Sequence, residues 1–346
     1  MTALRPAQAP VVAVSFDGRS LRALDQTLLP WEERHLILDN AEAVAQAVKR
    51  LAIRGAPLIG VAAAYGIVAE LVREPTESAL QRACETLRNA RPTAVNLAYA
   101  VERVRAAAVG AAGDQLIAAA LDEARAIEAE ELEASDRMAA AGAELLSGAR
   151  RVLTHCNTGA LAAPGRGTAL AVIAELAARQ GLETVLATES RPLLQGARLT
   201  VWELRQLDLP HALIVDSAAA GLIAAGAVDA VVVGCDRVAA NGDVANKVGT
   251  YGLALAAREA GIPFVVAGPT STIDAGCPSG SEITIEERDP GEVRRAASAN
   301  LTIADTPCRN PAFDVTPARM ITALVTEQGV ARPVESATVR AIRKRT

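Results

Sequence analysis

Apolar residues recur at two different spacings along the chain, and the spacing changes near residue 150. Between about residues 40 and 148 they recur every three or four positions, as on one face of a helix, among many Ala, Leu, Glu and Arg residues. Before this region, the apolar runs 11–15 and 34–38 are typical of strands around a turn at Asp17 and Gly18. The pattern predicts a mostly helical N-terminal domain with a short antiparallel sheet.

Beyond this region the apolar residues form short continuous runs, each followed by a polar or glycine-rich loop. The runs are residues 151–155, 184–188, 212–216, 230–234, 263–267 and 301–305. Helical patterns fall between them, at about residues 166–180, 195–207, 217–226 and 246–260. Apolar strands that alternate with helices are typical of a parallel sheet covered on both faces. We therefore expect an α/β protein in which a helical domain, residues 1–148, precedes a Rossmann-like, doubly wound parallel sheet domain, residues 149–346.

The composition excludes several classes of protein. Hydrophobic residues make up 51% of the chain, which is enough for a full core and rules out a wholly disordered protein. The net charge of −5 provides no basic surface for DNA or RNA, and the 2% of aromatic residues provide few stacking platforms for single strands. We expect no nucleic-acid partner.

No membrane or secretion signal is visible in the sequence. The longest charge-free apolar run, from about residue 55 to 69, is shorter than the roughly 18–20 residues of a spanning helix. The first residues lack the apolar stretch of a signal peptide. The five cysteines are an odd number without a CxxC pair, and with three histidines they form no metal-ligand spacing. We expect a cytoplasmic protein without a membrane partner or a bound metal.

Polar residues follow five of the predicted strands directly. They are residues 156–159, 189–191, 216–217, 234–237 and 268–270. Because ligands of open parallel sheets bind at the carboxyl ends of the strands, these five clusters are expected to line one edge and to form the functional site.

Cys156 lies in the first of these clusters. A free cysteine is ordinarily a small buried hydrophobic residue. Here it stands among polar residues at a strand end, with a helix start after it, which favours a functional thiol. His155 is the adjacent residue and should point to the opposite face of the strand, so a Cys–His dyad is not expected.

Asp236 has the corresponding place after another strand. Such a carboxylate is commonly a solvated loop residue, paired here with Arg237. At the end of an all-apolar strand, however, burial would raise its pKa and suit it to acid–base chemistry. Cys235 is expected to serve packing. Asp216 has the same placement as Asp236, so the spacing alone does not choose between the two.

Three further segments suggest anion binding. Asn246 and Lys247 stand at a predicted helix start, where a side chain and the helix dipole would act on one anion, although Asn246 is also a plausible simple N-cap. Arg54 and Arg91 precede predicted helices in the same way, and each is alone more commonly structural. Together they fit a small phosphorylated ligand.

The sequence lacks the common nucleotide-binding motifs. No GxxxxGK[ST] is present, and no GxGxxG follows a strand, which argues against nucleoside triphosphates and dinucleotides.

Long segments of the chain resemble the methylthioribose-1-phosphate isomerase family. This family is related to the regulatory subunits of the guanine-nucleotide exchange factor of translation initiation. The segments that carry the resemblance are Leu24–Pro30, Ile53–Pro57, Arg91–Asn96, Thr154–Gly159, Arg191–Thr200, Gly234–Lys247 and Asn310–Pro317. They occur in the order of the family and span nearly the whole chain.

The resemblance implies a reaction and a set of residues. The reaction is the aldose–ketose isomerisation of 5-methylthioribose 1-phosphate to 5-methylthioribulose 1-phosphate in methionine salvage. It implies Asp236 as proton donor and Cys156 as the residue that stabilises the transition state. The implied substrate-binding residues are Arg54, Gly55, Ala56, Arg91, Gln195, Asn246 and Lys247. A homodimer without metal or organic cofactor is also implied.

Three segments depart from the pattern of the family. One is residues 234–236, which read Gly-Cys-Asp in place of a Gly-Ala-Asp pattern. Residues 188–191 read Thr-Glu-Ser-Arg where the family usually has Asp-Glu-Thr-Arg, and residues 216–219 read Asp-Ser-Ala-Ala where it usually has Asp-Asn-Met-Ala. These changes leave open which 5-substituent the pocket accepts, because pocket walls discriminate small groups by only a few kcal/mol. The alternative substrates are 5-deoxyribose 1-phosphate and ribose 1,5-bisphosphate.

Two alternatives belong to other classes of protein. A non-catalytic regulatory subunit would have lost the Cys156 and Asp236 pair, and both residues are present. A nicotinamide-dependent dehydrogenase would use the sheet domain with a glycine fingerprint, which the sequence lacks.

Overall fold

A computed structural model describes residues 11–91, 94–297 and 299–343. The described chain divides into two compact units. Of the described residues, the helical unit comprises those from 11 to 135 together with 160–167, and the sheet unit comprises residues 136–159 and those from 168 onward. The domain boundary expected between residues 148 and 149 stays a prediction.

A three-stranded antiparallel sheet opens the helical unit, in the order β1-β2-β3. The strands are β1 (Val14–Phe16), β2 (Leu21–Leu24) and β3 (His35–Leu38). The turn expected at Asp17 connects β1 to β2, and the Asp17 carboxylate accepts the backbone N–H groups of Arg19 and Ser20. The short antiparallel sheet is therefore confirmed, with β2 as a strand that the sequence pattern did not reveal.

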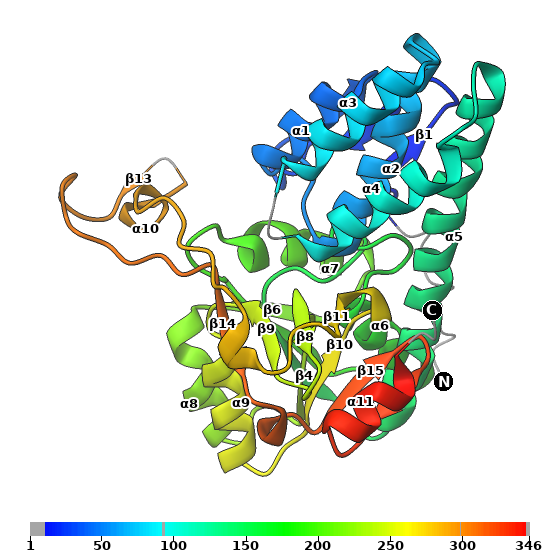
Figure 1. Cartoon of the computed structure of the whole chain (residues 1–346). Coiled ribbons are helices and arrows are strands. Elements are labelled where there is room, and N and C mark those ends of the chain that lie inside the picture. Colours follow the sequence, from blue (N-terminus) through cyan, green and yellow to red (C-terminus); the bar gives the residue numbers. More distant parts are fainter. Residues whose placement is uncertain (1–10, 92–93, 298, 344–346) are drawn as a thin grey trace. The chain divides into compact units, whose positions relative to one another are not determined.

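Helices fill the rest of this unit and lie side by side (Figure 1). They are α1 (Ala41–Lys49), α2 (Ala56–Arg73), α3 (Glu77–Arg88) and α4 (Val95–Ala108). Asn40 caps α1 and Thr76 caps α3, each accepting a backbone N–H with its side chain. Among the described helices, α2 alone is long and apolar enough to cross a membrane by length and composition, and 78% of it is buried, as in a core helix.

The long helix α5 (Asp114–Leu145) continues across the division between the units at residue 135. Its last turns pack on the sheet unit's α6, where a Cβ on Gly142 would press into the Val172 side chain. After Gly159 the chain contributes residues 160–167 to the helical unit and then returns to the sheet unit.

The main sheet has seven strands in the order β16-β15-β10-β7-β4-β5-β6. The strands are β4 (Arg151–Thr154), β5 (Thr184–Thr188), β6 (His211–Ile214), β7 (Ala230–Val233), β10 (Phe264–Ala267), β15 (Ala323–Thr326) and β16 (Gly329–Ala331). All pairs are parallel except the edge strand β16. The strand order reverses between β4 and β7, as in the doubly wound Rossmann sheet, so the expected fold class is confirmed.

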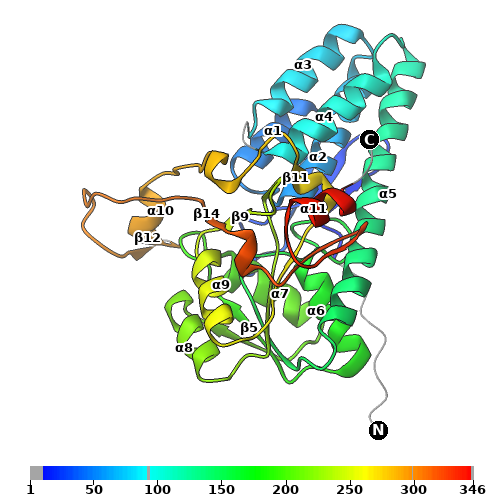
Figure 2. The ribbon, with the colours of Figure 1, turned by 60° about the horizontal axis from the view of Figure 1, so that its bottom comes forward.

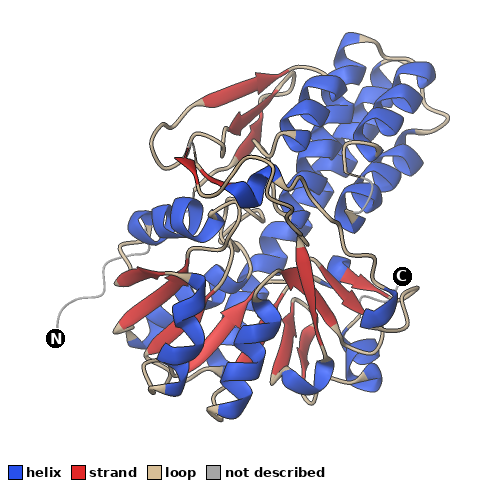
Figure 3. Cartoon of the chain, turned by 90° about the vertical axis from the view of Figure 1, so that its left-hand side faces the viewer, coloured by secondary structure: helices blue, strands red, loops and turns tan. Residues whose placement is uncertain are grey.

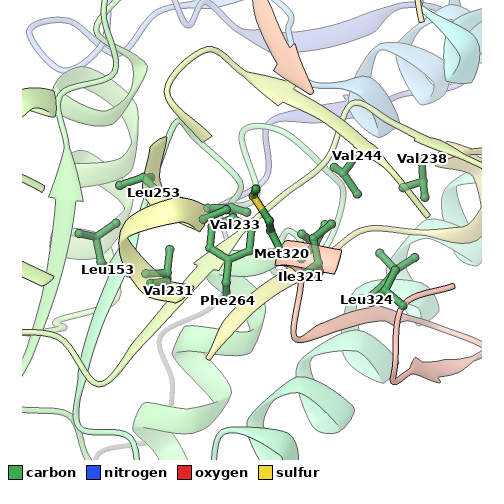
Figure 4. Packing of buried hydrophobic residues seen from close by; sticks show 14 of the residues in the cluster. Leu153, Val231, Val233, Val238, Val244, Leu253, Phe264, Met320, Ile321 and Leu324 are labelled. Carbon is green, nitrogen blue, oxygen red and sulfur yellow. The ribbon is translucent and has the colours of Figure 1, made fainter. Parts of the chain in front are cut away.

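Helices cover both faces of this sheet (Figure 3). They are α6 (Ala169–Gln180), α7 (Val201–Gln206), α8 (Ala219–Ala224) and α9 (Thr250–Glu259), and a π-helix, η1 (Gly196–Thr200), precedes α7. Val231 and Val233 of β7 pack with residues of α8 and α9, and Phe264 lies beside them (Figure 4). Because side chains alternate along a strand, Val232 faces the opposite side, where α6 contacts β7.

A second, four-stranded sheet in this unit has the order β11-β8-β9-β14. The strands are β8 (Arg237–Ala239), β9 (Val244–Lys247), β11 (Ile273–Asp274) and β14 (Phe313–Thr316). The remaining α-helices and strands are α10 (Gly291–Arg294), β12 (Arg295–Ala296), β13 (Ala299–Asn300) and α11 (Ser336–Ile342). In Figures 1 and 2, α10 and its neighbouring strands form an arm that stands away from the seven-stranded sheet.

One predicted strand is wrong. Residues 301–305 form no strand, and Leu301 and Ile303 are exposed. The sixth parallel strand is β15, whose four residues are all buried between β10 and β16. Both segments are short apolar runs, and only the pairing with β10 distinguishes them.

Candidate active site

The loops after β4, β5 and β6 are joined by hydrogen bonds at the carboxyl edge of the parallel sheet. The Cys156 N–H donates to Ser190 Oγ at 2.8 Å. The backbone N–H groups of Ser190 and Arg191 donate to the two carboxylate oxygens of Asp216, each at 2.7 Å. The expectation that these polar clusters share one edge is confirmed, because each follows a neighbouring parallel strand.

Cys156 has a left-handed backbone, with φ of +65°, although it is not a glycine. Such a conformation costs about 1–2 kcal/mol in a residue with a Cβ. The Cys156 N–H donates to Ser190 Oγ, and the Cys156 carbonyl accepts from Thr200 Oγ1 at 2.6 Å. The residue is 9% exposed, so its backbone is held inside the protein by two hydroxyl groups.

His155 is not a base for the thiol. Its ring lies 2.6 Å from Thr188 Oγ1 through Nδ1 and 2.9 Å from the Val248 carbonyl oxygen through Nε2. Because a carbonyl oxygen only accepts, Nε2 carries the proton and Nδ1 accepts from the Thr188 hydroxyl. Both ring nitrogens are therefore engaged, in agreement with the expectation that no Cys–His dyad forms.

Burial lowers the pKa of His155, which predicts a loss of stability in mild acid. Below a pH of about 6.5 the unfolded chain protonates this histidine while the folded protein keeps it neutral, so the unfolded state binds more protons. The free energy of unfolding should fall by up to about 1.4 kcal/mol per pH unit below 6.5. Urea denaturation at pH 7.5, 6.5 and 5.5 measures this, and His155→Gln should show a shallower dependence. Equal pH dependence in the two proteins would contradict the assignment.

Asp236 follows β7, the neighbour of β4 at the point where the strand order reverses. Its backbone N–H donates to the Ala245 carbonyl at 3.0 Å, and its side chain is half-buried. Arg237, the partner considered for it from the sequence, has its guanidinium 3.7 Å from the Asp274 carboxylate. Asp216, the alternative acid, uses its carboxylate to hold two backbone N–H groups, which indicates a structural role.

Cys235 serves packing, as expected. Its thiol lies 3.3 Å from Thr272 Oγ1, and a Cβ on Gly268 would overlap the sulfur. Burial raises the pKa of this thiol to about 12, so it remains protonated at neutral pH.

Asn246 and Lys247 do not stand at a helix start. Both are buried on β9, between β8 and β14. Lys247 Nζ donates to the Ala312 carbonyl at 2.9 Å and lies over the Phe313 ring. Asn246 Nδ2 donates to Thr250 Oγ1, so Asn246 is not an N-cap.

The helix that follows, α9, begins at Thr250 after a left-handed Gly249. The Asp314 carboxylate accepts the N–H groups of Gly249 and Tyr251 at 2.7 and 3.0 Å. Burial raises the pKa of Asp314. The start of α9 therefore already has a carboxylate, and the expected joint action of Asn246, Lys247 and the helix dipole on one anion is wrong.

Gln195 immediately precedes η1 and is 7% exposed. Its Oε1 atom is buried, and no hydrogen-bond partner for it is found in the described part of the chain. A buried polar oxygen without a partner costs free energy, which a ligand with a hydroxyl group would recover. Thr158 Oγ1, two residues after Cys156, is in the same situation.

The remaining predicted residues lie in the helical unit. Gly55 has φ of +94° and immediately precedes α2, and a Cβ there would overlap the Ala162 backbone. The Leu58 N–H donates to the Ala162 carbonyl at 3.1 Å, so Gly55 is required by packing inside this unit. Ala56 is the first residue of α2, with Arg54 and Arg91 half-buried in the loops before α2 and α4.

The structure adds residues that the sequence reasoning missed. Ser190 and Thr200 contact the backbone of Cys156, and Asn157 Nδ2 donates to Glu203 Oε1 at 2.6 Å beside them. The sequence carries one sign of Thr200: it is a polar residue between the apolar residues Leu199 and Val201, as is typical of a buried hydroxyl with a specific partner. Across residues 11–91, 94–297 and 299–343, no group of three or more His, Cys, Asp or Glu residues is placed to hold a metal ion.

Comparison with known proteins identifies relatives over nearly the full chain. Residues 52–333 match the model of the Initiation factor 2 subunit family. Methylthioribose-1-phosphate isomerase of Anaeromyxobacter dehalogenans is 50% identical over 327 residues, covering 94% of this chain and 95% of that protein. The protein of the same name in Thioalkalivibrio sulfidiphilus is 47% identical over 339 residues, covering 96% of this chain and 97% of its own.

Two solved structures are also similar. The crystal structure of 5-methylthioribose 1-phosphate isomerase from Pyrococcus horikoshii is 39% identical with a TM-score of 0.89, and covers 98% of this chain and 96% of that one. The structure of translation initiation factor eIF-2B, subunit delta, from A. fulgidus is 38% identical with a TM-score of 0.85, and covers 95% of this chain and 99% of that one.

Proposed function

Because the chain belongs to the initiation factor 2 subunit family and is about half identical to methylthioribose-1-phosphate isomerases, we propose that it has their activity. The protein is an aldose–ketose isomerase of methionine salvage. It converts 5-methylthioribose 1-phosphate to 5-methylthioribulose 1-phosphate.

The observation that carries this function is the placement of Cys156 and Asp236. They follow β4 and β7, the adjacent parallel strands between which the strand order reverses. Ligands of doubly wound sheets bind in the crevice outside the carboxyl ends of these strands. This placement supports the proposal that the pair implied by the family resemblance carries out the reaction.

The chemistry gives each of the two residues a task. The anomeric oxygen of the substrate carries phosphate, so the sugar ring opens only if its ring oxygen is protonated. Asp236 donates that proton as the bond from C1 to the ring oxygen breaks. Hydrogen then moves from C2 to C1, the C2 hydroxyl gives up the proton that restores the acid form of Asp236, and the ketone forms with no atom gained or lost. A buried thiol at Cys156 provides a water-poor contact for the developing charge.

The direct test is turnover by the purified protein. It should isomerise 5-methylthioribose 1-phosphate faster than 5-deoxyribose 1-phosphate or ribose 1,5-bisphosphate when the three are compared side by side. Faster turnover of either other sugar would replace the proposed substrate with a sister substrate. Absence of turnover with all three would favour the regulatory-subunit alternative, to which the similarity with the eIF-2B structure is relevant.

Arg54 and Arg91 are proposed to bind the substrate phosphate from the helical unit. The first turn of α2 has few backbone N–H groups for an anion, because Pro57 has none and the Leu58 N–H donates to the Ala162 carbonyl. The positive charge that binds the phosphate therefore has to come from the guanidinium groups. A charge-assisted hydrogen bond contributes about 1.5–3 kcal/mol. Arg54→Ala and Arg91→Ala should therefore each raise KM about tenfold or more.

Steady-state kinetics of the variants check this prediction, after thermal melting has shown that they are as stable as the wild type. Arg22→Ala is the matched control, because Arg22 is an exposed arginine on β2 of the same unit. An unchanged KM in both site variants would contradict a phosphate-binding role.

The other binding residues and the oligomeric state are proposed on the family resemblance, and the location and the absence of nucleic-acid and membrane partners on the composition of the chain. The residues that bind the substrate besides Arg54 and Arg91 are Gly55, Ala56, Gln195, Asn246 and Lys247. The protein functions as a cytoplasmic homodimer without nucleic acid, membrane, metal or organic cofactor. Light scattering during size-exclusion chromatography tests the dimer, and a monomeric mass would contradict it.

A further inference from the structure

The backbone of Cys156 is held on both sides by hydroxyl groups that are completely buried. Ser190 Oγ accepts its N–H at 2.8 Å, and Thr200 Oγ1 donates to its carbonyl at 2.6 Å. Ser190 and Thr200 are each 0% exposed. Cys156 has the left-handed conformation that residues with a Cβ rarely adopt, so these two contacts act on a backbone that would otherwise relax.

We propose that Ser190 and Thr200 are positioning residues that lock Cys156 in its left-handed conformation and thereby hold its thiol in place for catalysis. The inference rests on the proposed function, because it assigns a task to the neighbours of the proposed catalytic thiol. Neither hydroxyl is assigned a contact with the reacting atoms.

Ser190 is itself firmly held. Its own backbone is left-handed, with φ of +61°, and its N–H donates to Asp216. Its hydroxyl also lies 3.3 Å from the Thr188 carbonyl, to which it donates, and a Cβ on Gly196 would press on this hydroxyl and overlap that carbonyl. Because Gly196 has no Cβ, η1 approaches the Thr188 carbonyl and the Ser190 hydroxyl closely. The Ser190 hydroxyl, which accepts the hydrogen bond from the Cys156 N–H, is therefore held in a defined position.

Thr200 is fixed from the other side. It is the last residue of the π-helix η1, in which the Val201 N–H reaches back to the Gly196 carbonyl. A π-helical turn is rare and often occurs at a functional site. Asn157 Nδ2 lies 3.3 Å from Thr200 Oγ1 and 2.6 Å from Glu203 Oε1, so the hydroxyl proton of Thr200 is directed to the Cys156 carbonyl.

This arrangement limits what Cys156 offers to a ligand. Its N–H and its carbonyl are both used inside the protein, so its thiol is the group left for the substrate. A loss of either hydroxyl frees one side of the strained backbone. The expected effect is therefore on the catalytic step rather than on substrate binding.

Two pairs of variants separate this role from simple stability. Thr200→Val removes the hydroxyl at nearly constant shape, and Thr200→Ser retains it. Ser190→Ala removes the other hydroxyl, and Ser190→Thr retains it at the cost of a β-branched residue at positive φ. We expect kcat to fall about tenfold or more in Thr200→Val and Ser190→Ala with KM changed less than about threefold, and the hydroxyl-retaining variants to recover most of kcat.

Thr326→Val is the matched control. Thr326 is also buried and donates its hydroxyl to a backbone carbonyl, that of Gly329, in the hairpin of β15 and β16. It should lower the melting temperature about as much as Thr200→Val and leave kcat unchanged. If Thr200→Val and Ser190→Ala keep the wild-type kcat, or if the hydroxyl-retaining variants lose kcat equally, the positioning role is overturned.

Alkylation of Cys156 gives a readout that needs no substrate. Iodoacetamide should label Cys156 several-fold faster in Thr200→Val and Ser190→Ala than in the wild type, with Cys308 as the internal reference. If the wild type lacks isomerase activity while these labelling rates rise, the proposed function fails and the locking of Cys156 stands. If the wild type is active and neither kcat nor labelling changes in the variants, the proposed function stands and the inference fails.

Discussion

Replacing Asp236 by asparagine should abolish turnover while the protein remains folded and binds substrate. The amide has the shape of the carboxyl group but has no acidic proton to donate to the ring oxygen. General acid catalysis contributes about 10²–10⁴-fold in rate, so kcat should fall by at least about 100-fold. The Asp236 backbone N–H, which pairs with Ala245, is unchanged by the substitution, so the strand ends should keep their places.

Asp229 provides the matched control for this variant. It stands at the opposite end of β7, where its carboxylate accepts the N–H groups of Arg150 and Arg151 and pairs with the Arg151 guanidinium. Asp229→Asn should lower the melting temperature and leave kcat within about twofold. If Asp236→Asn retained more than about a tenth of the wild-type kcat, a barrier change under about 1.4 kcal/mol, the role of proton donor would be wrong.

Cys156→Ser should lower kcat about tenfold or more. We expect this loss although Cys156 forms no covalent intermediate with the substrate in the wild type. Oxygen is smaller and less acidic than sulfur, so the hydroxyl neither fills the space of the thiol nor supports charge in the same way. His155 has both ring nitrogens engaged, so this neighbouring histidine is not placed to make Cys156 a nucleophile. Isomerisation also releases no group from the sugar. Steady-state kinetics measure the loss, and a wild-type kcat in the variant would remove Cys156 from the mechanism.

Substrate should protect Cys156 from iodoacetamide and leave the other cysteines unchanged. Cys84 and Cys277 are buried thiols whose pKa burial raises, so they serve as slow references. Peptide mass spectrometry with and without substrate gives the labelling rate of each. Equal labelling of Cys156 in both samples would place it outside the substrate site, and a trapped sugar adduct on it would overturn the non-covalent assignment.

The sheet and the edge that carries the proposed site were largely predictable from local patterns. A parallel strand that is buried on both faces needs a continuous apolar run. The polar residues that follow the run mark the end of the strand at which the chain emerges from the core. The run 230–234 and its successor Asp236 show both signals, and β7 and the expected edge agree with them. Cys156 was found by the same reasoning after β4.

Where several segments compete for one place, local patterns were not sufficient. Residues 301–305 have as good a strand pattern as Ala323–Thr326, yet only the latter pairs with β10. Asn246 and Lys247 look like a helix start because a helix follows three residues later. Their strand conformation depends on pairing with Phe313 and Asp314, more than sixty residues away, which no local window contains.

The sequence by itself determined the alternation of apolar strands and helices, because a strand buried on both faces needs an apolar residue at each position. With this alternation it also determined the edge of the sheet at which Cys156 and Asp236 stand. Only the tertiary structure decided the left-handed backbone of Cys156 and its hydroxyl partners. A cysteine adopts that conformation when contacts with other parts of the chain outweigh its own preference. Here Ser190 comes from the loop after the neighbouring strand β5, and Thr200 comes from the π-helix η1 that follows that loop. Such a conformation is a property of contacts between distant segments, so no local pattern could have predicted it.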